Sequence, residues 1–235
     1  MNAVSVIVAA IAPGVALMAY FYLKDKYVTE PIGMVARVFL YGVFLVFPVM
    51  VLQRGLHLWI GDSRAAAAFL VSGATEEFFK WFLLYYAVYK HREFDEPYDG
   101  IVYSAAVSLG FATLENVLYA WSLSADAATM LLRALLPVSA HALFAVMMGY
   151  YFGAARFSRT RERAFLASAL LVPMFWHGLY DYLLQLAAHR WMWFVLPLMA
   201  ILWIRAIWKM QLANDRSPYR PVHTHEDWKQ RVLKS

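Results

Sequence analysis

The sequence predicts an all-α polytopic membrane protein, a bundle of about seven transmembrane helices. Hydrophobic residues make up 62% of the 235 residues and charged residues only 16%, and the mean hydropathy is +0.51. These values lie outside the range of ordinary soluble domains. The apolar residues also gather in segments that reach the roughly 20 residues a helix needs to cross a bilayer. The chain has no cysteine, which excludes disulfide and thiol chemistry.

Seven such segments follow one another along the chain. The first, about 3 to 23, lacks the basic start and the small-residue cleavage site of a signal peptide, so we expect a retained span with a kink at Pro13 and Gly14. The others cover about 33–53, 65–89, 99–122, 130–155, 164–187 and 191–210. We therefore expect a membrane domain over residues 1–210 and a polar cytoplasmic tail over residues 211–235.

The distribution of positive charge predicts the orientation of the bundle. Most lysines and arginines fall in one set of alternate loops, whereas the other set receives only Arg54, Arg64, Arg133 and Arg190. Because positively charged loops stay in the cytoplasm, we expect the N-terminus outside and the C-terminus inside. The formal net charge of +5 is then a consequence of topology, and it gives no reason to expect nucleic-acid binding.

The third segment carries the most unusual residues of the chain. Glu76 and Glu77 are adjacent in an otherwise apolar stretch, and Lys80 follows one turn later. A carboxylate at bilayer depth is costly, and two adjacent carboxylates also repel each other. Glu76 and Lys80 share one helix face, so an internal ion pair can form. We expect further partners, or a function, to compensate the remaining cost.

Other segments place ionisable residues at a similar depth. At 1.5 Å per helical residue, Glu76, Glu115, His141 and His177 all lie roughly 21 to 24 Å from the predicted cytoplasmic ends of their segments. Asn116 and Asp181 extend this layer. A single buried histidine or ion pair commonly just joins two helices. Three carboxylates and two histidines at one depth instead favour a functional cluster.

One chemistry that fits such a cluster is metal-assisted hydrolysis. His141, His177 and Glu115 would form a three-ligand zinc site with an open position for water. One of the paired glutamates would act as the base, and Asp181 would orient His177 or complete the metal site.

Other chemistries remain open from the residues alone. In a metal-free hydrolase, the paired glutamates would be the base and the histidines and Asn116 would stabilise the oxyanion. Spacing does not separate the two mechanisms because the chain has no HExxH motif. A proton-coupled transporter also uses carboxylates and histidines at the midplane, although the two halves of this chain show no convincing repeat. A receptor or scaffold would not need the cluster.

Several motifs resemble those of the PrsW intramembrane proteases. They occur in family order and on the predicted spans, over about residues 10 to 205: IAPGVA from residue 11, YFYLKD from 20, TEEFFK from 75, FDEPYDGIVY from 94, GFATLEN from 110, His141, and HGLYD from 177. The family is distantly similar to the CAAX-processing and bacteriocin-immunity proteases, which share the paired glutamates and two later histidines. The resemblance implies site-1 cleavage of a single-span anti-sigma factor on its extracytoplasmic side, which leads to sigma-factor activation.

The loop before the fourth segment also belongs to the family pattern. By helix rise, Glu96 and Asp99 lie roughly 20 Å from the polar layer, at the cytoplasmic edge. We expect Pro97 and Gly100 to shape a turn and Asp99 to cap the following helix. Glu96 is kept as a candidate functional residue.

Overall fold

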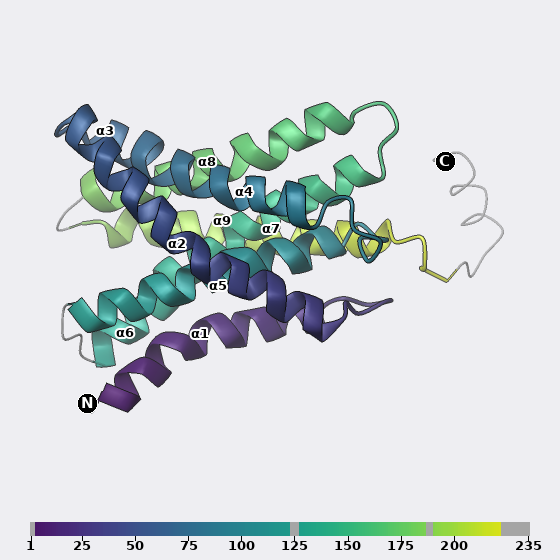
Figure 1. Ribbon diagram of the computed structural model, residues 1–235, viewed down its shortest axis with the longest axis horizontal. Helices are drawn as coiled ribbons and strands as arrows, with labels where there is room; N and C mark the ends of the chain where they lie inside the picture. The colour runs from purple at the N-terminus through teal and green to yellow at the C-terminus, as the bar shows by residue number, and fades with distance from the viewer. Residues whose placement is uncertain (1–2, 123–126, 187–189, 222–235) are drawn as a thin grey trace.

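The computed structural model describes residues 3–122, 127–186 and 190–221. Within these ranges the chain forms helices and no strand, which confirms the all-α class. The order along the chain is α1 (Ala3–Leu23), α2 (Ile32–Ile60), α3 (Arg64–Ala66), η1 (Ala67–Ala74), α4 (Thr75–Ala87), α5 (Asp99–Ser122), α6 (Ala127–Arg133), η2 (Ala134–Val138), α7 (Ser139–Arg156), α8 (Glu162–Leu186) and α9 (Met192–Asp215). The helices run side by side along the long axis of the molecule, and α9 ends at the opposite end from the start of α1 (Figure 1).

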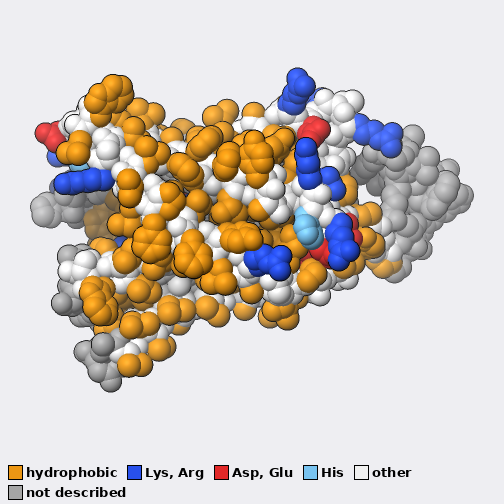
Figure 2. Space-filling model, viewed as in Figure 1, with side chains coloured by type: hydrophobic (Ala, Val, Ile, Leu, Met, Phe, Trp, Pro, Cys, Tyr) orange, Lys and Arg blue, Asp and Glu red, His pale blue; other side chains and the backbone are white. Residues whose placement is uncertain are grey.

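Within the described ranges, five helical stretches are long and apolar enough to cross a membrane: most of α1, α2, α5, the continuous stretch Ala128–Arg156, and α9. Hydrophobic side chains cover the middle of the visible face and the charged ones lie toward its two ends (Figure 2). The protein is thus a multi-pass membrane protein. Helices α3 to α4 (residues 64–87) and α8 (Glu162–Leu186) lie in the other two predicted segments, but they carry polar residues of the site and are not among the five. A total of seven spans stays a prediction.

Helix α5 is the centre of the bundle and packs closely against α7. Gly149 and Gly153 of α7 lie one helical turn apart and touch the backbone around the start of α5. A Cβ atom at Gly149 would lie 2.2 Å from the carbonyl oxygen of Gly100, and one at Gly153 would lie 2.2 Å from that of Pro97. Small residues at this spacing let two membrane helices approach to backbone contact.

Two π-helical segments interrupt the α-helical geometry. The hydroxyl of Thr75 donates to the carbonyl oxygen of Leu70 at 3.1 Å, and that of Ser139 donates to Ala134 at 3.0 Å, in each case five residues back. Segment η1 directly precedes α4 and η2 directly precedes α7. Because a π-turn holds one extra residue, it rotates the side chains that follow it. The two segments therefore set the directions in which the first turns of α4 and α7 face.

The C-terminal helix is longer than the sequence predicts. Helix α9 continues to Asp215, five residues beyond the expected end of the membrane domain at residue 210. Ser217 and Tyr219 then bond to the loop before α5. The first part of the expected tail is therefore packed on the bundle, whereas residues 222–235 of that tail lie outside the described residues.

Candidate active site

The paired glutamates lie in the first turn of α4, inside the protein. Glu76 is 5% exposed, Glu77 is fully buried and Lys80 is 1% exposed. The Lys80 ammonium donates to Glu77 Oε1 at 2.7 Å and to Glu76 Oε2 at 3.3 Å. It also lies 3.1 Å from His141 Nδ1 and 4.6 Å from the centre of the Phe111 ring. One cation therefore serves both carboxylates; the spacing along the helix predicts its pair with Glu76, and the contact with Glu77 is an addition.

Two histidines from α7 and α8 face the glutamates. His177 Nδ1 lies 2.9 Å from Glu77 Oε1, and His141 Nε2 lies 3.1 Å from Glu115 Oε2. The imidazole rings are perpendicular, with centroids 5.1 Å apart. Phe144 stacks on the His177 ring at 4.9 Å. Packing and hydrogen bonds thus fix the orientation of both rings before any substrate binds.

A contact between glycines brings α4 close to α8. Gly73, at the end of η1, touches Gly178 of α8, and a Cβ atom at Gly73 would lie 2.8 Å from the Gly178 nitrogen. Neither position has room for a side chain. The close approach allows Glu77, four residues after Gly73, to reach His177, the residue directly before Gly178.

Glu76 lies close to both histidines of the site. Its Oε2 is 4.0 Å from Nε2 of His141 and 4.0 Å from Nε2 of His177. Glu76, Glu77, His141 and His177 each offer a ligand atom, and these atoms lie within 4.8 Å of one another in a buried cluster. Among the described residues, Glu77 Oε2 has no hydrogen-bond partner. Imidazole nitrogens and carboxylate oxygens are the donors that catalytic zinc uses, so the cluster could hold a metal ion.

The other two predicted metal ligands lie beside the histidines. Glu115 contacts His141 Nε2 as described, and Asp181 Oδ2 lies 3.5 Å from His177 Nε2. Asp181 also accepts a hydrogen bond of 2.5 Å from the Ser72 hydroxyl. Both carboxylates lie outside the group of four ligand residues, in which the paired glutamates supply the oxygen atoms.

Asn116 is at the predicted depth but bonds elsewhere. Its Nδ2 donates to the carbonyl oxygen of Ala10 at 2.9 Å, and its Oδ1 accepts from Arg133 Nε at 2.7 Å. The side chain therefore joins α1, α5 and α6 and makes no described contact with the paired glutamates.

Glu96 lies far from the cluster, at the end of the bundle where α5 begins. Its Oε2 accepts a hydrogen bond from the Ser217 hydroxyl. The prediction that Asp99 caps α5 was wrong. Its Oδ2 instead accepts hydrogen bonds from the backbone N–H groups of Asp95 and Glu96 in the preceding loop, both at 2.7 Å. The loop residues of the family pattern thus form a separate structure from the glutamate and histidine cluster.

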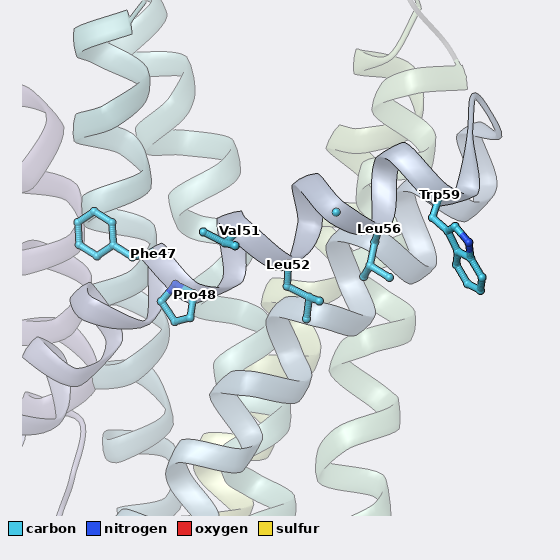
Figure 3. Close-up of a pocket in the computed structure, with 7 residues that line it drawn as sticks. Phe47, Pro48, Val51, Leu52, Leu56 and Trp59 are labelled. Atoms are coloured by element: carbon cyan, nitrogen blue, oxygen red, sulfur yellow. The ribbon is translucent and has the colours of Figure 1, made fainter.

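Sequence reasoning missed two polar contacts of Glu76. Gln53 Nε2 donates to Glu76 Oε1 at 3.1 Å, and the Ser72 hydroxyl lies 3.5 Å from the same oxygen. Gln53 is at the predicted end of the second span, but α2 continues to Ile60. The one sequence signal for this contact was the polar side chain of Gln53 next to a long apolar run. Next to it, an apolar groove follows the same helix, lined by Phe47, Pro48, Val51, Leu52, Gly55, Leu56 and Trp59 (Figure 3).

Comparison with known proteins identifies the family of this chain. The family model described as PrsW family intramembrane metalloprotease matches residues 30–206. Protease PrsW of Geobacillus kaustophilus (strain HTA426) is 55% identical over 211 residues, which cover 89% of this chain and 92% of that protein. Protease PrsW of Bacillus subtilis (strain 168) is 51% identical over 213 residues, 90% and 96% of the two chains.

A more distant relative extends the agreement. Protease PrsW of Clostridioides difficile (strain 630) is 34% identical over 211 residues, 86% of this chain and 87% of that protein. No solved structure matches the chain significantly. The matches span the helices that build the cluster, and the relatives are proteases of the membrane. The chain therefore belongs to the PrsW family of intramembrane proteases and is a membrane-embedded peptidase.

Proposed function

We propose that this protein is an endopeptidase that hydrolyses a peptide bond of a single-span membrane protein, with Glu76 at the reaction centre. The observation that carries the proposal is the position of Glu76 Oε2, 4.0 Å from the Nε2 atoms of both His141 and His177. Its other oxygen is held by Gln53. A carboxylate fixed in this way can accept a proton from a water molecule held between it and the two imidazoles.

Glu77 has a different role in this proposal. Both Lys80 and His177 bond to its Oε1, and the side chain is fully buried. It is therefore a positioning residue that orients His177 and keeps Lys80 between the carboxylates. The imidazoles, together with Lys80, supply the positive or donor groups that stabilise negative charge on the carbonyl oxygen during attack.

We infer that the cluster holds Zn²⁺ through His141 and His177 together with Glu77, whose Oε2 is buried without a hydrogen-bond partner among the described residues, so that Glu76 stays free to act as the base. When bound, zinc would acidify a water molecule and polarise the scissile carbonyl. The contact of Glu77 Oε1 with Nδ1 of His177 would then orient that ring with its Nε2 toward the metal. Glu115 and Asp181 lie against the Nε2 atoms themselves, so their carboxylates would lie beside the bound ion. The donor set supports zinc because nitrogen and carboxylate ligands are those of hydrolytic zinc sites.

We further propose seven spans, with the N-terminus outside, the C-terminus in the bacterial cytoplasm, and a single-span anti-sigma factor as the substrate. The positive charge of alternate loops supports the orientation. The family resemblance supports the substrate, which would be cut on its extracytoplasmic side. The same membership favours a peptidase over the proton-coupled transporter.

Reconstitution tests the function directly. The purified full-length protein and an anti-sigma factor tagged at both ends should together yield two fragments, with the cut in the segment just outside the substrate span. Glu76→Gln should yield none, whereas Asp62→Asn, an exposed carboxylate in the loop after α2, should cleave normally. Intact substrate with the wild-type protein, combined with proton-coupled solute flux in the same vesicles, would replace the peptidase by the transporter.

A further inference from the structure

A second buried acidic cluster lies at the other end of the bundle. Asp25 follows α1, Glu96 lies in the loop before α5, and Asp99 is the first residue of α5. Their exposed fractions are 8%, 0% and 0%. Each offers a carboxylate oxygen, and these atoms lie within 4.8 Å of one another. Figure 1 shows the end of α1 and the loop before α5 meeting at the end of the bundle where α9 also ends.

Most oxygens of this cluster have no protein donor. Both oxygens of Asp25, Oε1 of Glu96 and Oδ1 of Asp99 are buried without a hydrogen-bond partner among the described residues. Only Asp99 Oδ2 and Glu96 Oε2 are satisfied, by backbone N–H groups and by the Ser217 hydroxyl. Buried acceptors normally have a partner because leaving them unpaired is costly. Four unpaired oxygens in one place therefore call for a ligand.

The carboxyl groups lie too close together for all of them to ionise readily, and among the described residues no cation pairs with them. None of the ion pairs between described residues includes Asp25, Glu96 or Asp99. Glu30 lies nearby and accepts a hydrogen bond from the Tyr103 hydroxyl. Burial raises the pKa of Asp25 to about 8, and the neighbouring carboxylate of Glu96 adds to this effect. Burial also raises the pKa of Glu30 to about 7.

We propose that Asp25, Glu96 and Asp99 bind a divalent cation of the oxygen-preferring class, Mg²⁺, Ca²⁺ or Mn²⁺, at a site separate from the Glu76 cluster. A set of carboxylate oxygens without imidazole or thiolate suits these ions. Two positive charges offset most of the charge of three carboxylates. One cation also engages several oxygens at once, whereas each proton supplies a single donor.

The site would join two segments that are far apart in sequence, the one after α1 and the one at the start of α5. Neighbouring contacts connect the first of these to the last turn of α9: the Lys26 N–H donates to Asn214 Oδ1 at 3.1 Å, and Asn214 Nδ2 donates to the carbonyl oxygen of Lys24 at 3.2 Å. Tyr219 donates to Asp95 at 2.8 Å on the outside of the cluster. The cation would complete this connection at its buried centre by binding the segment after α1 to the loop before α5, whose Glu96 is bonded in turn to Ser217 after α9.

Manganese binding tests the proposal on the full-length protein in detergent after removal of metals by a chelator. Electron paramagnetic resonance should count one more bound Mn²⁺ per chain in the wild type than in Asp25→Asn. The matched control, Asp215→Asn, changes a carboxylate that is 55% exposed near the same end and should bind as the wild type does. The site should persist in His141→Ala, which separates it from the Glu76 cluster and from the fate of the proposed peptidase activity.

Melting temperatures give a second readout. Without metal, Asp25→Asn should melt near the wild-type temperature, because burial and the neighbouring Glu96 already favour the uncharged form of Asp25 by raising its pKa, and asparagine is uncharged as well. Mg²⁺ or Ca²⁺ should raise the melting temperature of the wild type and of Asp215→Asn by several degrees, and that of Asp25→Asn much less. Should Asp25→Asn not fold, Glu96→Gln replaces it. Equal Mn²⁺ counts and equal shifts in the wild type and the cluster variant would overturn the proposal.

Discussion

At the scale of single residues, Lys80 offsets the electrostatic cost of burying Glu76 and Glu77 next to each other. Its ammonium contacts Glu76, Glu77 and His141 and is 1% exposed. A buried ion pair contributes little compared with an apolar replacement, but removal of one partner leaves an uncompensated charge. Lys80 is therefore a prerequisite for placing two adjacent carboxylates in the interior of the protein.

Lys80→Met should destabilise the protein by roughly 3–5 kcal/mol, the usual cost of breaking a buried charge pair from one side, and should abolish cleavage. Unfolding in mixed detergents measures the change, with Lys90→Met, an exposed residue after the same helix, as the control. Adding Glu77→Gln to Lys80→Met should recover part of the stability and none of the activity. A single variant as stable as the wild type would show that Lys80 does not neutralise the pair.

Zinc content is the second prediction at the residue scale. The purified protein should contain about one equivalent of zinc, and His177→Ala should contain much less, because His177 is one of the two nitrogen donors of the cluster. A chelator should stop cleavage and added Zn²⁺ should restore it. Elemental analysis gives the metal content. Full cleavage by metal-free protein would instead favour the mechanism in which the glutamates and histidines act alone.

At the scale of elements, the contact between η1 and α8 sets the distance between the glutamates and His177. Gly73→Ala would push a Cβ atom against the backbone of Gly178, 2.8 Å away, and backbone atoms move little. We expect a loss of roughly 1–3 kcal/mol in stability, as in other overpacked sites, and a larger relative loss of cleavage rate. Gly55→Ala is the matched control, because nothing lies within 4 Å of its Cβ position. Equal rates for both variants would contradict the role of this contact.

The same elements show how far the sequence predicts the fold. Lengths and apolarity locate the helices α1 and α5 to the residue, because apolar runs and their breaks decide where a helix enters and leaves the membrane. The π-turns of η1 and η2 were not predicted, since runs of alanine, leucine and valine fit an α- or a π-turn equally well. The apolar run predicts that the second span ends at Gln53, but α2 continues past this residue, and the Gln53 amide holds Glu76.

The depth of a residue along its helix and the direction of its side chain together explain which of the predicted site residues meet. Helix rise predicted that Glu76, His141 and His177 lie in one layer, and they do meet. The helix rise gives the depth of a residue but not the direction in which its side chain points. The side chains of neighbouring helix residues point about 100° apart. Asn116 therefore faces Ala10 and Arg133 while its neighbour Glu115 faces His141. Which side of a helix meets which neighbour depends on packing between distant segments, which one sequence does not reveal.

At the scale of the whole molecule, the orientation in the membrane is the open prediction, and the absence of cysteine makes it easy to test. A single cysteine introduced as Asp62→Cys, in the loop after α2, should react with a membrane-impermeant maleimide in intact cells. Thr160→Cys, in the loop between α7 and α8, should react only after permeabilisation. Both positions are exposed. The reverse pattern would contradict an N-terminus outside.

The central claim, that Glu76 is the reacting carboxylate and Glu77 the positioning one, is tested most directly by comparing two variants in single-turnover cleavage of a reconstituted, tagged single-span substrate. Glu76→Gln should lower the rate by roughly 10²–10⁴-fold, the range that removal of a general base produces, while its melting temperature stays close to that of the wild type. Glu77→Gln should lower both the rate and the melting temperature, because it breaks the bonds to Lys80 and His177. A Glu76→Gln protein that cleaves at the wild-type rate would contradict the claim.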